Sequence, residues 1–280
     1  MPIDLHTHSR ASDGTDEPAE VIAAACAAGL DVVALTDHDT TAGWAQAGAE
    51  ARRRGVALIP GAEISCQVGG IGVHMLAYLH DPDEPELLAE MERTREDRVA
   101  RARRIVDRLA RDYPLTYPDV LRQVDDRATV GRPHIADALI ANGVVADREE
   151  AFATLLNSRS PYYLPHYAPD AGQVARLVRA AGGVPVIAHC RARHRGRVIT
   201  DDDIRDLADD GMLGIEVDHR DHADAERSQL RALAKDLDLL VTGSSDYHGT
   251  GKLNRIGENT TAPDQLERLI ALGTPQRVVW

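Results

Sequence analysis

The chain has 280 residues and a formal net charge of −13, with 43% hydrophobic and 28% charged residues. This composition is typical of a globular protein with one large α/β barrel or two smaller domains. The acidic charge disfavours binding to long duplex nucleic acid, and no apolar run approaches the length needed to span a membrane.

The cysteines and the N-terminus indicate a protein of the reducing cytoplasm. The three cysteines, Cys26, Cys66 and Cys190, form an odd and widely spaced set that does not suit a disulfide framework. No signal peptide is visible, because Met1 and Pro2 lead directly into the first apolar segment. We therefore expect free thiols, with Cys26 and Cys66 as small core residues, and a cytoplasmic location.

The N-terminal third alternates strands with helices. Helices are expected over 18–28, which Gly29 closes, and over 40–54, which Gly55 closes. Strands are expected over 3–6, 31–36, 56–60, 62–68 and 71–79. Gly69 and Gly70 separate the last two of these strands and predict a hairpin turn.

From residue 81 to about residue 160 the sequence is nearly all helical. Helices are expected there over 86–111, 118–124, 133–141 and 149–157. Strands then return at 184–188, 213–217 and 239–242, between helices at 173–181, 202–209 and 222–235. Short apolar strands that alternate with helices indicate a parallel sheet. We therefore predict an α/β fold, with a barrel built from residues 1–80 and 161–280 and a helical insertion subdomain over 81–160.

Histidines and carboxylates gather where the predicted strands end. His6 and His8 stand one residue apart, so both rings face the same side of a strand. Two imidazoles placed in this way form half of a transition-metal site. Further candidate ligands follow near later strand ends, namely Asp13, His38, Glu63, His74, His189, Asp246 and His248. Because active sites of α/β barrels lie at the carboxyl ends of the strands, the pattern predicts one polynuclear metal centre.

The motifs that carry these residues resemble those of the polymerase and histidinol phosphatase (PHP) family of metal-dependent phosphoesterases. They are His6-Thr7-His8 with Asp13, Thr36-Asp37-His38-Asp39, Gly61-Ala62-Glu63, His74, His189 and Ser245-Asp246-Tyr247-His248. Two further segments, 131–134 and 182–189, resemble the branch of bacterial nucleotide phosphatases and 5′-3′ exoribonucleases. Cys190 departs from that branch, in which proline commonly follows the histidine.

The resemblance implies a distorted (β/α)7 barrel whose centre holds two to three divalent metals. One metal is expected at His6, His8, Glu63 and Asp246. A second is expected at Asp13, His38 and His248. A third, which Glu63 bridges, is expected at His74 and His189. Nine nitrogen and oxygen ligands without a thiolate suit Mn²⁺, Zn²⁺ or Fe²⁺.

Such a centre predicts hydrolysis of a phosphate ester without a protein nucleophile. Two metals about 3.5–4 Å apart generate hydroxide near neutral pH and stabilise the developing charge. We expect a metal-bridging hydroxide, held by Asp13, Glu63 and Asp246, to attack in line. The expected substrates are nucleoside 3′,5′-bisphosphates, AMP-like nucleotides or short 5′-phosphorylated oligoribonucleotides. A histidinol-phosphate-type phosphatase and a non-catalytic metal- or nucleotide-binding module are the alternatives.

Four residues outside the ligand set are candidates for substrate binding. Arg132 and His134 begin a helix of the insertion, and an arginine there could grip a phosphate with two hydrogen bonds. Arg193 and His194 belong to the basic segment 191–197, which directly follows His189 and would lie at the rim of the site. A second phosphate could bind at this segment, and a solvated charged surface explains it equally well.

Several other polar residues allow two interpretations. Asp37 and Asp39 flank His38 and would orient the ligands, or Asp39 would cap the helix that follows. Four histidines belong to no motif and are expected to be ordinary hydrogen-bonded core or surface residues, namely His80, His166, His219 and His222.

Overall fold

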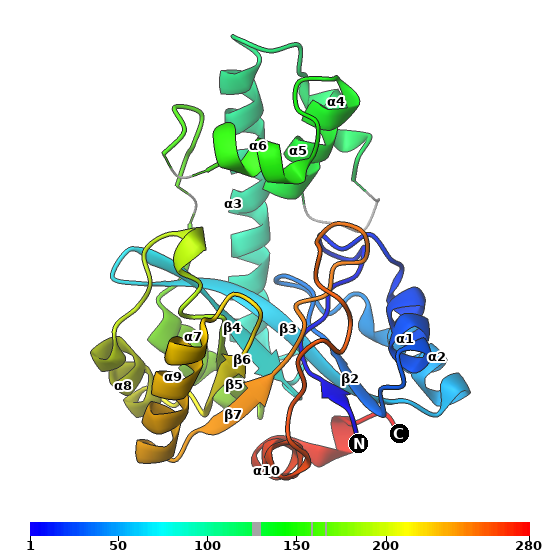
Figure 1. Ribbon diagram of the computed structural model, residues 1–280, viewed down its shortest axis with the longest axis vertical. Coiled ribbons are helices and arrows are strands. Elements are labelled where there is room, and N and C mark those ends of the chain that lie inside the picture. Colours follow the sequence, from blue (N-terminus) through cyan, green and yellow to red (C-terminus); the bar gives the residue numbers. More distant parts are fainter. Residues whose placement is uncertain (125–129, 158, 166) are drawn as a thin grey trace.

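The computed structural model describes residues 1–124, 130–157, 159–165 and 167–280. Its strands are β1 (Ile3–Asp4), β2 (Val32–Leu35), β3 (Ala57–Val68), β4 (Ile71–Tyr78), β5 (Val184–Ala188), β6 (Gly214–Asp218) and β7 (Leu240–Gly243). They form one sheet in the order β1 to β7 (Figure 1). A bridge between Thr7 and Tyr247 joins the segments that follow β1 and β7, so the sheet nearly closes into a barrel.

One strand of the barrel runs against its neighbours. The pairs β1–β2, β2–β3, β5–β6 and β6–β7 are parallel, whereas β4 is antiparallel to both β3 and β5. The parallel sheet expected from the alternating pattern is therefore only partly present. The reason is the hairpin at Gly69 and Gly70, whose positive φ angles of 54° and 77° reverse the chain between β3 and β4.

The strand β3 is a single element of 12 residues, although the sequence suggests two shorter strands. Pro60 pairs with Leu35 of β2, and the next residue, Gly61, pairs with Tyr78 of β4. The strand therefore continues through Pro60 and Gly61, because its first part pairs with β2 and its second part pairs with β4. This length matters for function, because β3 extends far enough to carry Glu63.

The helices are α1 (Pro18–Ala27), α2 (Trp44–Arg54), α3 (Pro85–Leu109), α4 (Tyr117–Leu121), α5 (Arg132–Ala141), α6 (Arg148–Thr154), α7 (Ala171–Ala180), α8 (Asp201–Asp209), α9 (Asp224–Asp236) and α10 (Pro263–Leu272). None of those in the described part of the chain combines the length and apolar character needed to cross a bilayer. Helix α2 begins at Trp44, four residues later than expected, because the chain first forms a turn in which the backbone N–H of Trp44 donates to the oxygen of Thr41 (3.1 Å). Helix α10 is absent from our sequence-based expectations.

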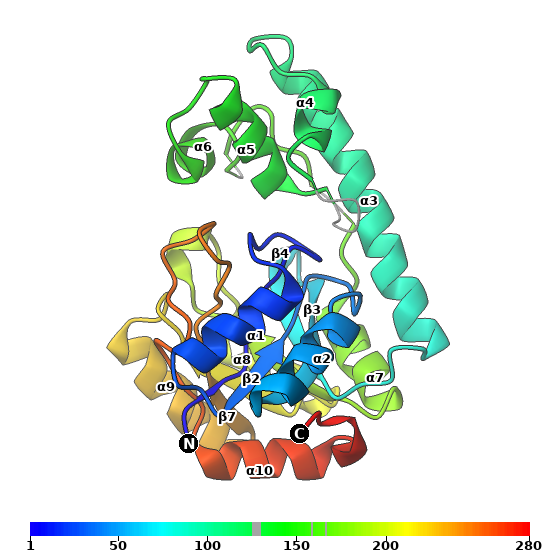
Figure 2. The same ribbon diagram turned by 90° about the vertical axis from the view of Figure 1, so that its right-hand side faces the viewer.

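Two cores meet along the long helix α3. Leu87 and Met91, near its start, belong to the core that β3 and β4 form with α7 to α9. Ile105 and Leu109, near its end, belong to a separate core with α4, α5 and α6. Figure 2 shows α3 rising along one side of the barrel and carrying α4, α5 and α6 above its loops. Helices α4, α5 and α6 are therefore held over one end of the barrel by a helix that both cores share.

The interior of the barrel is aliphatic. Its buried residues include Ile3, Ile59, Leu76 and Leu240, and the hydroxyl of the buried Tyr78 donates to the backbone oxygen of Leu5 (2.8 Å). Such close packing gives the strand ends a rigid base.

Candidate metal centre

The structure brings all nine expected ligand residues together at one end of the barrel. His6 and His8 follow β1, His38 follows β2, His189 follows β5, and Asp246 and His248 follow β7. Glu63 lies within β3, where His38 forms an isolated bridge with it. His74 lies in β4 and pairs with Ser65 of β3 and Ala188 of β5. Because β4 is antiparallel, its first half reaches the same end of the barrel as the carboxyl ends of its neighbours.

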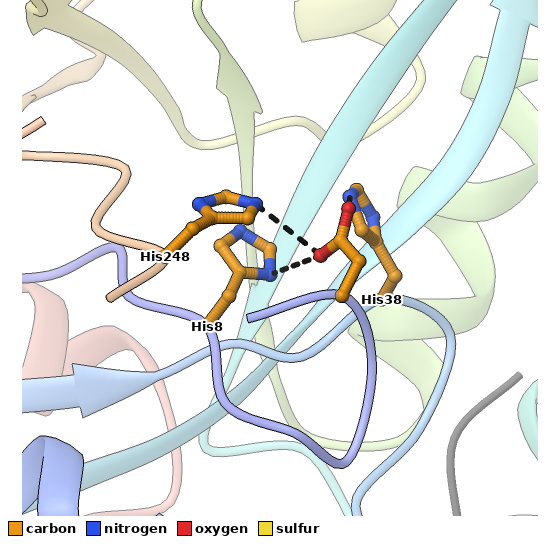
Figure 3. A group of neighbouring side chains, drawn as sticks. His8, His38 and His248 are labelled. Carbon is orange, nitrogen blue, oxygen red and sulfur yellow. Dashed lines mark ion pairs between the residues drawn. The ribbon is translucent and has the colours of Figure 1, made fainter. Parts of the chain in front are cut away.

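Three histidine side chains surround the carboxylate of Asp13. Possible ligand atoms of His8, Asp13, His38 and His248 all lie within 4.8 Å of one another. Nε2 of His248 is 3.2 Å and Nδ1 of His8 is 3.7 Å from Oδ1 of Asp13, and Nε2 of His38 is 3.7 Å from Oδ2. Figure 3 shows His8, His38 and His248 reaching this point from three separate segments.

Glu63 is the centre of the remaining groups. It is 1% exposed, and one ring nitrogen of each of five histidines lies within 3.3 Å of its oxygens, namely His6, His8, His38, His74 and His189. His74 and His189 face Oε1, at 2.7 and 2.9 Å, and the other three face Oε2. A carboxylate with both oxygens directed at different sets of imidazoles has the arrangement needed to bridge two metals.

The geometry of these contacts fits metal ligation better than hydrogen bonding. Nδ1 of His8, His38 and His74 and Nε2 of His248 are buried and have no hydrogen-bond partner among the described residues. Each nevertheless lies 2.7–3.7 Å from a carboxylate oxygen, without the alignment that a hydrogen bond requires. Buried polar atoms are rarely left unpaired. Nitrogen and oxygen atoms aimed at common points, with no thiolate among them, suit Mn²⁺, Zn²⁺ or Fe²⁺.

The carboxylates of the centre are ionised despite their burial. Burial raises the pKa of Glu63, but His74, His38 and His6 outweigh it and hold the pKa well below its usual range. Burial also raises the pKa of Asp13, but His248 and His38 lower it by more. For Asp246, Lys252 and His248 outweigh burial in the same way, so both pKa values lie well below their usual range. Three negative charges are therefore available to a cluster of cations.

Glu216 in β6 is a candidate functional residue that our sequence reasoning missed. Its fully buried carboxylate accepts hydrogen bonds from Nδ1 of His6 (2.9 Å), from the backbone N–H of His189 (2.7 Å) and from the hydroxyl of Ser244. Burial raises the pKa of Glu216, but His6 and His219 lower this pKa by more than burial raises it. The side chain is therefore ionised. A charged residue inside an otherwise apolar strand was the available sequence signal.

Asp37 and Asp39 hold the backbone around the centre. Asp37 accepts hydrogen bonds from the backbone and hydroxyl of Ser9 (2.8 and 2.7 Å) and from the hydroxyl of Ser12 (2.7 Å), which fixes the loop that carries Asp13. Asp39 accepts from the backbone N–H of Ser65 (2.8 Å) and does not cap α2, whose N-cap is Gly43. The helix-cap interpretation of Asp39 is therefore wrong.

The histidines outside the motifs differ in their surroundings. His222 donates from Nδ1 to the backbone oxygen of Val217 (2.9 Å), and His80 is buried with Nδ1 3.0 Å from the oxygen of Ala77. His219 is closer to the centre, with Nε2 3.6 Å from Oδ2 of Asp246. His166 lies outside the described residues.

The four candidate substrate-binding residues fall into two environments. Arg132 begins α5, and Nδ1 of the buried His134 accepts a hydrogen bond from the backbone N–H of Gly131 (3.0 Å). Arg193 and His194 are exposed, and each has an acidic partner, Glu226 at 2.5 Å and Asp221 at 3.5 Å respectively. His134 is thus buried and Arg132 half-buried, whereas Arg193 and His194 lie on the surface.

Comparisons with known proteins agree with this geometry. Residues 4–165 match the model of the PHP domain. The chain is 35% identical to a 3′,5′-nucleoside bisphosphate phosphatase of Chromobacterium violaceum, over 93% of this chain and 92% of that protein. It is 32% identical to a 5′-3′ exoribonuclease of Haemophilus influenzae, over 94% and 96%.

A solved structure shows the same fold over almost the whole chain. It is a protein of Bifidobacterium adolescentis described as a metal-dependent phosphoesterase, with a TM-score of 0.95 and 41% identity over 97% of this chain and 96% of that one. The distorted seven-stranded barrel expected from the sequence is therefore confirmed. The chain belongs to the PHP domain family and is an enzyme of its phosphoesterase class.

Proposed function

We propose that this enzyme removes phosphate from small nucleotides. The substrates are nucleoside 3′,5′-bisphosphates, AMP-like nucleotides or short oligoribonucleotides with a 5′-phosphate, which matches the names of its phosphatase and exoribonuclease relatives. The observation that carries the proposal is the convergence of nine ligand-type side chains, with Glu63 and Asp13 at the centres of their groups.

The residues present fit two to three divalent ions. We assign one ion to His6, His8, Glu63 and Asp246, a second to Asp13, His38 and His248, and a third to Glu63, His74 and His189. The close approach of His8 to Asp13 makes His8 a possible shared ligand of the first two sites. Such ions, when bound, supply Lewis acidity and lower the pKa of water toward neutrality.

The protein's own part is to hold charge in place. Asp13, Glu63 and Asp246 keep their negative charge, and imidazoles that are neutral once they bind an ion would leave that ion electrophilic. Glu216 fixes Nδ1 of His6 as the hydrogen-bond donor, so that Nε2 is left for the ion. Lys252 donates to Oδ2 of Asp246 (2.9 Å), which leaves Oδ1 facing the histidines. Substrate orientation is assigned to Arg132 and His134 in the insertion.

The cellular setting follows from the sequence. The three cysteines are free, and we place the enzyme in the cytoplasm. With a net charge of −13, its partners are small phosphorylated molecules rather than long duplexes or membranes.

Two alternatives are less well supported. A phosphatase for a histidinol-phosphate-type metabolite would use the same centre. A non-catalytic module would not need all nine ligand-type side chains to be retained and buried together.

A substrate screen at fixed Mn²⁺ tests the proposal. The screen compares AMP, adenosine 3′,5′-bisphosphate, histidinol phosphate, a short 5′-phosphorylated RNA and p-nitrophenyl phosphate. We expect the highest kcat/KM for the bisphosphate or the RNA. Preference for histidinol phosphate would favour the first alternative, and failure to turn over any of the five would favour the second.

A further inference from the structure

The helices above the metal centre contact the barrel through Arg148, the first residue of α6. Its Nη1 atom donates to the backbone oxygen of Gly251 (3.3 Å), which follows the candidate ligand His248 closely in the chain. Of the described residues in α4, α5 and α6, Arg148 is the one that hydrogen-bonds to the barrel. Figure 2 shows the loop after β7, drawn in orange, rising toward the insertion on the side away from α3. We call the contact between Arg148 and Gly251 the clasp.

Both ends of the clasp are shaped for this contact. Nε and Nη2 of Arg148 donate to the two carboxylate oxygens of Asp137 in α5 (2.7 and 2.6 Å), so the guanidinium is held in one orientation. Its Nη1 end is left to face the barrel. On the barrel side, a Cβ atom on Gly251 would clash with Nη1 of Arg148. Glycine at this position therefore lets the guanidinium reach the loop, and any other residue would displace it.

The clasp lies beside the metal centre. Burial lowers the pKa of Arg148, but its partner Asp137 and the nearby Asp13 raise this pKa by more. Lys252, the residue after Gly251, donates to Oδ2 of Asp246 (2.9 Å). Each end of the clasp is thus next to a candidate metal ligand. The clasp and α3 therefore support the insertion on opposite sides of the centre.

The surroundings of the clasp are acidic. Asp147, Glu149 and Glu150 flank Arg148 and are exposed, and Asp137 neutralises Arg148 itself. Every further nucleotide of an RNA chain adds one negatively charged phosphodiester, which such a surface repels. The clasp therefore closes this side of the centre to an RNA chain both sterically and by charge.

We propose that the clasp makes the enzyme prefer mononucleotides and dinucleotides to longer RNA. The inference rests on the proposed function and narrows its substrate class. With its phosphate at the metals, a mononucleotide ends beneath the insertion, whereas the rest of a longer RNA has to emerge between the insertion and the barrel. One long hydrogen bond is weak enough to break, so longer RNA is disfavoured rather than excluded. Loss of such a bond from a charged group corresponds to about a ten-fold change in an equilibrium.

The test opens the clasp from each of its two ends. Gly251→Ala displaces the guanidinium with its Cβ atom, and Arg148→Met removes the donor. One matched control is Gly72→Ala in β4, where a Cβ atom meets nothing within 4 Å. The other is Arg122→Met, which removes another arginine of the insertion, one that pairs with Asp119. Metal content and melting temperature are measured for all four Mn²⁺-loaded variants, so that a folding defect is recognised.

The substrates are adenosine 3′,5′-bisphosphate, a 5′-phosphorylated dinucleotide and a 5′-phosphorylated decanucleotide RNA. For the wild type, we expect kcat/KM for the decanucleotide to lie at least about ten-fold below that for the dinucleotide. Gly251→Ala and Arg148→Met should raise the value for the decanucleotide about five- to ten-fold and change the other two values by less than about two-fold. Both controls should match the wild type. A wild type that hydrolyses the decanucleotide as well as the dinucleotide, equal changes on all three substrates, or no rise for the decanucleotide in a folded clasp variant would overturn the proposal.

Failure of the proposed function would give a different result. If the wild type turns over none of the three substrates, binding of the dinucleotide and the decanucleotide, each labelled with fluorescein at its 3′ end, is measured by fluorescence anisotropy on the Mn²⁺-loaded protein. The clasp is supported if Gly251→Ala tightens binding of the decanucleotide about five-fold or more and changes that of the dinucleotide by less than about two-fold. It is rejected if the two ligands respond alike.

Discussion

Nδ1 of His6 and Oε1 of Glu216 lie 2.9 Å apart, and both side chains are fully buried. This contact directs the other ring nitrogen of His6 toward the centre, where it lies 3.0 Å from Nε2 of His8. A carboxylate behind a metal-binding histidine fixes its tautomer and orientation. The hydrogen bond between His6 and Glu216 thus connects β6, a strand without any expected ligand, to the candidate metal centre.

Replacing Glu216 with glutamine should weaken metal binding without removing a ligand. An amide can still accept from His6, but it lacks the negative charge that makes the imidazole a better donor. We expect the affinity for Mn²⁺ to fall about ten- to a hundred-fold, measured by metal titration of the chelator-treated protein. Glu92→Gln, which neutralises an exposed glutamate on α3, is the control and should bind metal normally. Unchanged affinity in Glu216→Gln would show that the contact is only structural.

Removing Asp13 or His38 should chiefly lower kcat. Both side chains belong to the group that also contains His8 and His248. Loss of the ion that this group would hold removes several kcal/mol of charge stabilisation from the transition state. Asp13→Ala and His38→Ala should therefore reduce kcat about a hundred- to a thousand-fold on p-nitrophenyl phosphate. The aliphatic barrel core should keep the variants folded. Near-normal kcat in a variant shown to lack that ion would refute the assignment, and Asp107→Ala on the exposed side of α3 is the control.

Metal should stabilise the fold, because the ligands come from segments far apart in the sequence. An ion that binds only the folded state adds about 2.7 kcal/mol when its free concentration is a hundred times Kd. For a chain of this size, that corresponds to roughly 5 °C in melting temperature. We expect EDTA treatment to lower the Tm by this amount and Mn²⁺ to restore it. Ca²⁺, which prefers oxygen ligands, is the control and should restore little. An EDTA-insensitive Tm would argue against an integral centre.

The cysteines should differ in reactivity. Cys66 and Cys190 are buried, whereas Cys26 is half-buried. Burial also raises the pKa of Cys66 well above its usual range, so at pH 9, where roughly three-quarters of an ordinary thiol is ionised, Cys66 stays protonated. We expect one fast equivalent with a thiol reagent at pH 7 and at pH 9, and three after unfolding. The fast equivalent should vanish in Cys26→Ser, and more than one in the native wild type would contradict the prediction.

Local patterns in the sequence predicted much of the fold and the positions of the candidate ligands. His6 and His8 were expected on one face of a strand over 3–6; β1 ends at Asp4, and both rings still face the centre from the segment that follows it. The hairpin at Gly69-Gly70 follows from turn chemistry. Helix α10 could also have been predicted, because Pro263 begins it, Leu266 and Leu269 are its buried residues, and Gly273 follows it. The sequence pattern for this helix was therefore present, and our prediction overlooked it.

Other features depend on contacts between distant segments. The role of Asp39 is set by Ser65 and Arg98, which lie 26 and 59 residues away. The partners of Glu216 come from the segments that follow β1, β5 and β7, and only the folded barrel brings them together. Sequence spacing alone carries no information on such contacts.

Anomalous diffraction from crystals of the purified, undepleted protein, with elemental analysis of the same sample, tests the central claim most directly. We expect at least two metal ions within bridging distance, with Glu63 in contact with more than one of them. An undepleted protein with no metal near His6, His8 and Asp246 would contradict the account.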